Sequence, residues 1–141
     1  MNRKGIMGLP LKLTIMMMVL MLSIPVVTSI MEYNEERMMD MAMSKEASKI
    51  EDAVRSVYRS GEGSYSIVDI DIPENCSMTI GGYSVNSYTI ACLHDGKELS
   101  RRYMDNPAVR FADITEINGC ARLEISMSYD HDGKIVEVTA L

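Results

Sequence analysis

The side chains of this chain that could support chemistry are three cysteines, two histidines and several acidic turns. Covalent catalysis needs a nucleophile beside a base and a group that stabilises an oxyanion. The sequence contains no G-x-S-x-G motif, no phosphate-binding loop and no H-E-x-x-H motif. The cysteines fall at inward positions of expected strands, where thiols are usually inert. We therefore expect no enzyme activity and no cofactor.

Two turns that contain histidine are the candidate metal sites. His94 precedes Asp95 and Gly96, and residues 130–133 (DHDG) resemble the start of a calcium loop. An EF-hand loop needs further oxygen ligands, a closing glutamate and flanking helices, whereas a strand pattern resumes at Lys134. Zinc needs Cys, His or acidic ligands clustered at a suitable spacing, which neither turn supplies. Both turns instead fit β-hairpins, and we expect no metal site.

Two covalent modifications fit an oxidising compartment outside the cell. Cys76, Cys92 and Cys120 allow one disulfide with one thiol left over, and the pairing is open. The alternative is that all three stay reduced and buried as small apolar side chains. Asn75 begins an N-x-S glycosylation acceptor at an expected turn.

Charge is distributed unevenly along the 141 residues, which carry a net charge of -6. Arg3, Lys4 and Lys12 are the only charged side chains before Glu32, so the remaining 11 basic residues face all 20 acidic ones. Such an acidic domain repels phosphate backbones, because nucleic-acid affinity rests largely on neutralising phosphates. We therefore expect no nucleic-acid partner.

The first element that the sequence predicts is an apolar helix over residues 9–31. Apart from Lys12 this stretch is uncharged, and about 20 apolar residues at ~1.5 Å rise each cross a ~30 Å hydrocarbon layer. Basic residues precede it and acidic residues follow it, which predicts a cytoplasmic N-terminus and an extracellular C-terminal domain. A secretory peptide ending at Ser29 is an alternative, although the apolar run exceeds the usual length of such peptides.

Residues 32–60 lack Gly and Pro and are rich in helix-forming residues, which predicts an amphipathic helix continuing outside the membrane. Its apolar residues recur at steps of three and four: Met39, Met43, Ala47, Ile50, Val54 and Val57. This stripe must cover either the β domain of the same chain or the helices of neighbouring subunits. Gly61 and Gly63 are expected to end the helix.

Residues 64–141 are expected to form an antiparallel β-sheet or β-sandwich, so that the fold class is α+β. Alternation with a period of two predicts strands near 68–72, 76–80, 88–92, 99–104, 123–129 and 136–140. Tight hairpin turns are expected at 81–82, 95–96 and 130–133. Five tyrosines are expected to be sheet residues, which aromatic side chains favour, rather than a ligand cage: Tyr65, Tyr83, Tyr88, Tyr103 and Tyr129.

The N-terminal residues Arg3, Lys4, Gly5 and Ile6, followed at once by the apolar run, resemble the class III signal of archaeal type IV pilins and pilin-like proteins. In that family a prepilin peptidase cuts after the glycine and leaves the hydrophobic helix on the mature protein. The resemblance implies a leader over residues 1–5, cleavage between Gly5 and Ile6, and a surface filament in which subunits pack through this helix. Many pilins carry glutamate at the fifth mature position, where this chain has Pro10.

Two other functional interpretations stay open. The basic residues also fit the flank of an uncleaved signal anchor. The protein would then be a single-pass membrane protein whose β domain binds a surface partner without forming filaments. An enzyme of the cell envelope is the third class, and it would need a cleft with convergent polar groups.

Overall fold

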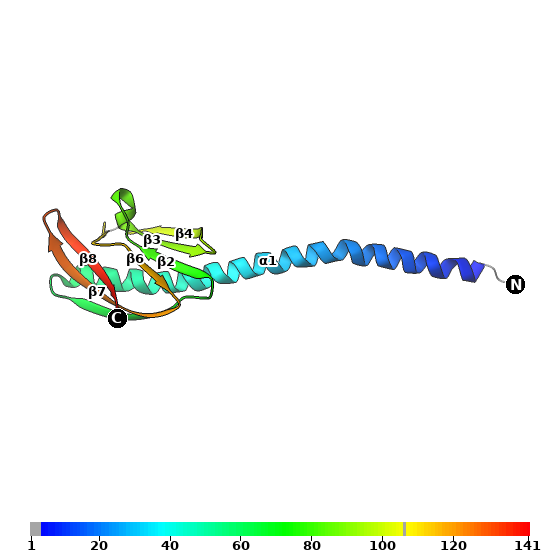
Figure 1. Ribbon diagram of the computed structural model, residues 1–141, viewed down its shortest axis with the longest axis horizontal. Helices are drawn as coiled ribbons and strands as arrows, with labels where there is room; N and C mark the ends of the chain where they lie inside the picture. Colours follow the sequence, from blue (N-terminus) through cyan, green and yellow to red (C-terminus); the bar gives the residue numbers. More distant parts are fainter. Residues whose placement is uncertain (1–3, 106) are drawn as a thin grey trace. The chain divides into compact units, whose positions relative to one another are not determined.

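The computed structural model describes residues 4–105 and 107–141, with the helix side chains described from Gly8 onward. A long helix, α1 (Lys4–Ser60), precedes a small β-rich head, as the α+β prediction requires (Figure 1). α1 continues through Pro10 and Pro25. The chain divides into two compact units between Met38 and Met39.

The head contains two four-stranded sheets, with strand orders β1-β7-β8-β5 and β4-β3-β2-β6. The elements after α1 are β1 (Tyr65–Asp71), β2 (Cys76–Ile80), the 3-10 helix η1 (Ser84–Tyr88), β3 (Thr89–His94), β4 (Lys97–Tyr103), β5 (Arg110–Phe111), β6 (Thr115–Asn118), β7 (Cys120–Asp130) and β8 (Gly133–Ala140). Neighbouring strands pair antiparallel, except that β5 runs parallel to β8. The sequence did not predict the short strands β5 and β6.

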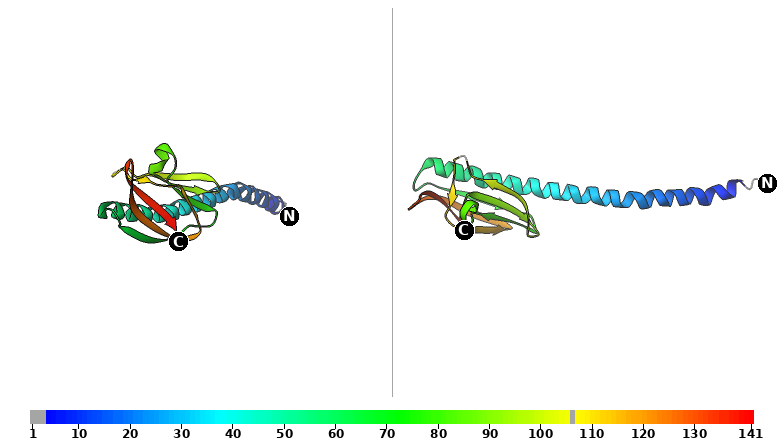
Figure 2. Two further views of the ribbon diagram at one scale, coloured as in Figure 1. Left: turned by 60° about the vertical axis from the view of Figure 1, so that its left-hand side comes forward. Right: turned by 90° about the horizontal axis from the view of Figure 1, so that it is seen from above.

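The amphipathic stripe of α1 packs against the head of its own chain. Met43, Ala47, Ile50 and Val54 have no exposed surface, and they join one apolar cluster with residues of both sheets, while Met39 packs at its margin. The right-hand view in Figure 2 shows the strands on one side of this part of α1. The sequence left open whether this stripe packs against the β domain of the same chain or against helices of neighbouring subunits. In the structure it packs against the β domain of its own chain.

Two of the three expected hairpin turns are confirmed, and the third is wrong. Residues 95–96 join β3 to β4, and the segment 130–133 joins β7 to β8. Between β2 and β3 the chain instead forms η1, so that Tyr88 ends a 3-10 helix rather than beginning a strand. Gly82 explains the difference, because a Cβ there would lie 2.6 Å from the Cβ of Asn86. The glycine thus permits η1 to pack closely, rather than a two-residue turn.

Polar contacts that the sequence did not predict fix α1 against the strands. The Glu46 side chain is buried and accepts a hydrogen bond from the Asp71 backbone N–H at 3.1 Å. It also pairs with Lys49 at 2.8 Å. A buried carboxylate is tolerated when it is paired and hydrogen-bonded in this way. Glu46 therefore joins α1 to the end of β1.

Candidate functional site

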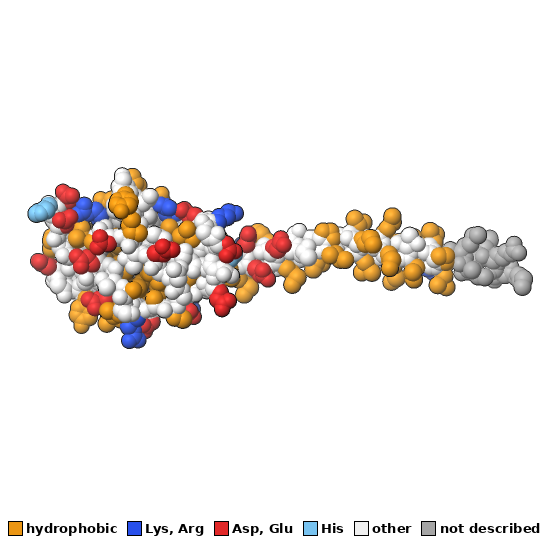
Figure 3. Space-filling view, viewed as in Figure 1, with side chains coloured by type: hydrophobic (Ala, Val, Ile, Leu, Met, Phe, Trp, Pro, Cys, Tyr) orange, Lys and Arg blue, Asp and Glu red, His pale blue; other side chains and the backbone are white. Residues whose placement is uncertain are grey.

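The apolar part of α1 is exposed along its whole length. Every large apolar side chain from Leu9 to Met31 is more than half exposed, from 53% at Val27 to 74% at Leu22. Figure 3 shows this stretch as a run of hydrophobic side chains, with acidic side chains following it. The helix is long and apolar enough to cross a membrane. The chain is therefore suited to single-pass membrane anchoring.

The hydroxyl groups within residues 9–31 are all bonded to the helix itself. Thr14, Ser23, Thr28 and Ser29 each donate to a backbone carbonyl three or four residues earlier, at 2.7 to 3.1 Å. An unbonded hydroxyl in hydrocarbon would carry the full cost of losing its water. These internal hydrogen bonds make the segment compatible with lipid despite its four hydroxyl side chains.

The prepilin-type cleavage residues Lys4, Gly5 and Ile6 lie outside the residues whose side chains are described, and cleavage there stays a prediction. Asn75 is exposed in the turn between β1 and β2, with φ of 62°. Its sequon partner Ser77 lies in β2, which pairs with β3 on one side and β6 on the other. Glycosylation of Asn75 also stays a prediction.

All three cysteines are free thiols, and they occupy two different environments. Cys76 and Cys92 are buried on the neighbouring strands β2 and β3, and burial raises the pKa of both thiols. The expectation that every cysteine points inward is wrong for Cys120, which is exposed at the start of β7. Its Sγ lies 3.1 Å from Oδ1 of Asp71, its register partner on the outward face. That hydrogen bond and the charge of Asp71 raise the pKa of the Cys120 thiol.

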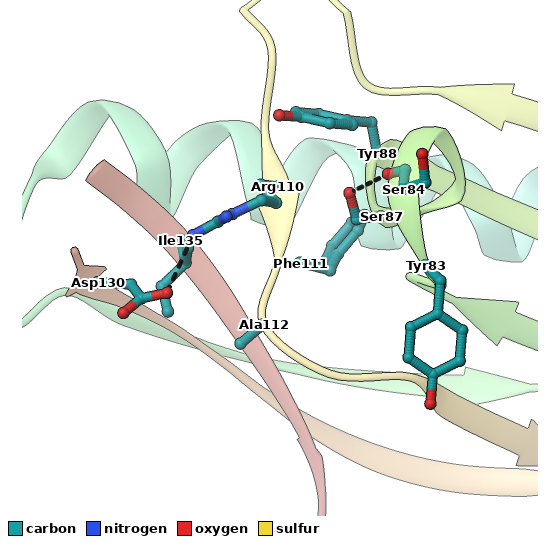
Figure 4. A pocket seen from close by; sticks show the side chains of 10 residues that line it. Tyr83, Ser84, Ser87, Tyr88, Arg110, Phe111, Ala112, Asp130 and Ile135 are labelled. Carbon is teal, nitrogen blue, oxygen red and sulfur yellow. Dashed lines mark hydrogen bonds and ion pairs between the residues drawn. The ribbon is translucent and has the colours of Figure 1, made fainter. Parts of the chain in front are cut away.

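The head carries a hollow of about 500 Å³ between η1, β5 and the β7–β8 hairpin. Figure 4 shows the side chains that line it, among them Tyr83, Ser84, Ser87, Tyr88, Arg110 and Asp130. This volume lies in the range of small-molecule sites, about 300–1,000 Å³. We name this hollow the Arg110 hollow.

The segment that forms one wall of the Arg110 hollow is held in an uncommon conformation. Ser84 has φ of 57°, which costs a residue other than glycine some backbone strain. The Ser87 hydroxyl donates to the Ser84 carbonyl at 2.6 Å, and the Asn86 N–H donates to the Tyr83 carbonyl at 3.1 Å. These bonds fix the segment without a ligand.

Two carboxylates face the single arginine of the Arg110 hollow. The Arg110 guanidinium lies 3.2 Å from Asp130 and 3.3 Å from Asp132. Both carboxylates come from the β7–β8 hairpin, so this turn supplies the groups that neutralise the arginine of β5. The hollow therefore presents polar atoms without excess positive charge.

A second hollow of about 280 Å³ shares Gly82 and Tyr83 with the Arg110 hollow. It contains Arg101, which pairs with Glu98 at 2.6 Å and also donates to the Asn86 side-chain carbonyl. The hydrogen bond with Arg101 lowers the pKa of Glu98, and the same bond raises the pKa of Arg101. We name this second site the Arg101 hollow. It repeats the pattern of one arginine held by a carboxylate.

Both hollows are lined by hydrogen-bonding side chains. No histidine is among the residues that line either hollow, and the Ser87 hydroxyl is engaged with a backbone carbonyl. In the described part of the chain, no three His, Cys, Asp or Glu side chains are grouped closely enough to hold a metal ion. What the hollows offer is hydrogen-bonding groups around an exposed aromatic ring.

Sequence reasoning missed this site because it assigned all five tyrosines to sheets. Three of them do lie in strands: Tyr65, Tyr103 and Tyr129. Tyr83, however, directly precedes η1, and Tyr88 is the last residue of η1. The signal that could have revealed the site is the polar and aromatic segment of residues 83–88 (YSVNSY) directly after two glycines.

Together, these features define a class of protein with one apolar helix suited to spanning a membrane and a β head that bears the Arg110 hollow and the Arg101 hollow. No protein-family model, curated protein or solved structure matches the chain.

Proposed function

We propose that this protein is a pilin-like structural subunit, anchored by residues 9–31 and assembled through this helix into a type IV pilus-like surface filament. In this proposal the prepilin peptidase removes residues 1–5 on the cytoplasmic side. The head lies outside the cell, since basic residues precede the span and acidic residues follow it. We assign the chain no catalytic role.

The observation that carries the proposal is the contrast between the two parts of α1. The stripe that includes Met43 and Ile50 is covered by the head, whereas the side chains from Leu9 to Met31 are exposed on every face of the helix. Apolar surface of this extent needs a covering of lipid or of other apolar helices. In the proposed pathway lipid covers this helix while the subunit is stored in the membrane. Apolar helices of neighbouring subunits cover it once the subunit packs into the filament core.

Mass spectrometry of the N-terminus and electron microscopy of the producing cells test the proposal. We expect a mature chain that begins at Ile6, and filaments that contain the protein. Gly5→Val should block cleavage and abolish filaments, because the peptidase of the pilin family requires the glycine. The matched control is Gly8→Val, since a Cβ at Gly8 meets no atom within 4 Å. A wild-type chain that still begins at Met1 would overturn the processing step.

The two hollows favour a second candidate function, a membrane-anchored head that binds a surface partner without forming filaments. This candidate predicts an intact N-terminus and cells without filaments. It also predicts that Gly5→Val leaves surface display of the head unchanged. The same two measurements therefore separate the candidates.

A further inference from the structure

Tyr83 has an unusual position for a tyrosine in a small domain. The residue is 84% exposed, and it lines both the Arg110 hollow and the Arg101 hollow. In the view of Figure 4 its ring points away from Arg110, so that it forms the boundary of the Arg110 hollow rather than filling it. An exposed aromatic ring flanked by polar hollows offers an apolar face to a ligand that is itself both apolar and polar.

The two hollows that Tyr83 lines are matched in chemistry. Arg110 is held by Asp130 and Asp132 on one side, and Arg101 is held by Glu98 on the other. Guanidinium and carboxylate groups are planar and can each make two parallel hydrogen bonds. Adjacent hydroxyl groups of a sugar ring fit such paired donors and acceptors.

Charge excludes an anionic ligand. Each arginine already has a carboxylate within 3.3 Å, so a phosphate or sulfate would have to compete with that carboxylate for the guanidinium. The chain also has an acidic balance, with a net charge of -6. Like charges near a binding site disfavour an approaching anion. The ligand that these pairs accept is therefore rich in hydroxyl groups and uncharged.

The segment that carries Tyr83 is held in place by contacts of Asn86 before any ligand binds, which favours binding. Asn86 packs against Gly82 and accepts the hydrogen bond of Arg101 through its side chain. Its backbone carbonyl accepts a hydrogen bond from the Thr89 hydroxyl at 2.9 Å. A site that is rigid before binding loses less conformational freedom when the ligand arrives.

We propose that the head binds a neutral, linear oligosaccharide that crosses the Tyr83 ring and places sugar units in the Arg110 hollow and the Arg101 hollow. The C–H face of one sugar packs on the ring, and hydroxyl groups on either side bond to the arginine–carboxylate pairs. Because Tyr83 lines two hollows, of about 500 and 280 Å³, affinity should rise from a monosaccharide to a trisaccharide. This role goes beyond the filament proposal, and the head would have it with or without assembly.

Binding of the full-length protein to an array of immobilised sugars tests this inference. The protein is held in lauryldimethylamine oxide micelles, because a maltoside detergent would itself present a sugar. The array carries neutral mono-, di- and trisaccharides of glucose, galactose, mannose and N-acetylhexosamines, with sialylated and sulfated sugars beside them. We expect binding to neutral di- or trisaccharides that exceeds binding to the corresponding monosaccharides.

Tyr83→Ala should weaken this binding about tenfold, the upper end of what an aromatic contact contributes. Tyr65→Ala is the matched control, since Tyr65 is a 68% exposed tyrosine on β1 that lines neither hollow. Arg101→Gln supplies a second variant on the other side of the ring and should also weaken binding. Wild-type protein that binds no neutral sugar, that prefers the anionic sugars, or that binds as well after Tyr83→Ala would overturn the inference. None of these results bears on cleavage at Gly5, so the filament proposal is tested separately, by the mature N-terminus and by electron microscopy.

Discussion

Arg102 of β4 donates a hydrogen bond to the Glu51 carboxylate of α1 at 3.1 Å, and a second to the Ser44 hydroxyl about two helical turns earlier. The partly buried Glu51 also accepts a hydrogen bond from Arg55 at 2.9 Å. Burial raises the pKa of Glu51, but the hydrogen bonds from Arg55 and Arg102 outweigh it and hold the pKa below the ordinary 4.5. One carboxylate thus joins the helix to the edge strand of the second sheet.

Replacing Glu51 should change how the stability of the head depends on pH. Because the folded-state pKa is lowered, Glu51 stabilises the folded state above its ordinary pKa of 4.5 and loses this effect as pH falls through the folded-state pKa. At pH 7, Glu51→Gln should lower the free energy of unfolding by about 1–3 kcal/mol, since two charged hydrogen bonds are weakened. Urea denaturation of wild type and variant should show this difference shrinking below pH 4.5.

The control for this prediction is an ion pair of the same type that lies in solvent. Arg122 and Asp69 are 2.7 Å apart, but their side chains are 61% and 69% exposed. Exposed pairs contribute little to stability, because water and salt screen them. Asp69→Asn should leave the denaturation midpoint nearly unchanged at pH 7. If Glu51→Gln and Asp69→Asn lowered the free energy of unfolding equally, the stabilising role assigned to Glu51 would be contradicted.

The buried Glu46 gives a second prediction for the packing of α1. Glu46→Ala removes the side-chain acceptor of the Asp71 N–H from a buried helix position, which costs about 1–3 kcal/mol. Glu46→Gln keeps a side-chain carbonyl at that position and should be less destabilising than alanine. Denaturant titrations of both variants check the order. Equal destabilisation would mean that the hydrogen bond to Asp71 contributes nothing.

The apolar periodicities of the sequence predicted most of the fold, because they report which face of an element is buried. The stripe of Met43, Ala47, Ile50 and Val54 is buried as predicted. Alternation likewise identified β7, in which Leu123, Ile125 and Met127 are buried. In both elements a simple repeat determines the burial, so no knowledge of tertiary contacts is needed to read it.

Features that depend on contacts between distant residues could not be predicted in the same way. Gly82 packs against Asn86, and Arg110 pairs with Asp132, 22 residues further along the chain. Neither contact leaves a periodic signal. The prediction that Cys120 points inward was wrong for a related reason. Cys120 pairs with Asp71 of the neighbouring strand, and both side chains lie on the solvent face. The candidate site is built from contacts of this kind, which explains why it was missed.

Cysteine reactivity provides a third prediction. Maleimide should modify Cys120 first in the folded protein, because Cys76 and Cys92 are buried. The raised pKa of Cys120 should make this reaction slow near pH 7, since the thiolate is the reactive form. Asp71→Asn removes the charge that raises the pKa and should accelerate labelling several-fold. Intact-mass measurements over time, with Cys120→Ser as the control, follow each addition.

The expected disulfide is tested by the same measurements on protein purified without reductant. Cys76 and Cys92 lie on paired strands, whereas Cys120 lies in the other sheet. If a bridge forms, we expect it between Cys76 and Cys92, and the mass should then show a single reactive thiol under denaturing conditions. A bridge that includes Cys120 would require the head to differ from the arrangement described here.

The membrane span supplies the last prediction. A lysine at the centre of the span should oppose insertion by about 2.5–3.5 kcal/mol, whereas a lysine near its end extends to the membrane surface. Leu20→Lys should therefore shift the protein out of the alkali-resistant membrane fraction, and Leu20→Met should not. Lys12 already lies near one end of the span, so Lys12→Ala should leave the membrane fraction unchanged. If residues up to Ser29 were instead a removed secretory peptide, wild-type protein would be soluble and would begin at Ile30. That result would exclude both the filament subunit and the anchored head, because each requires the apolar helix to stay attached.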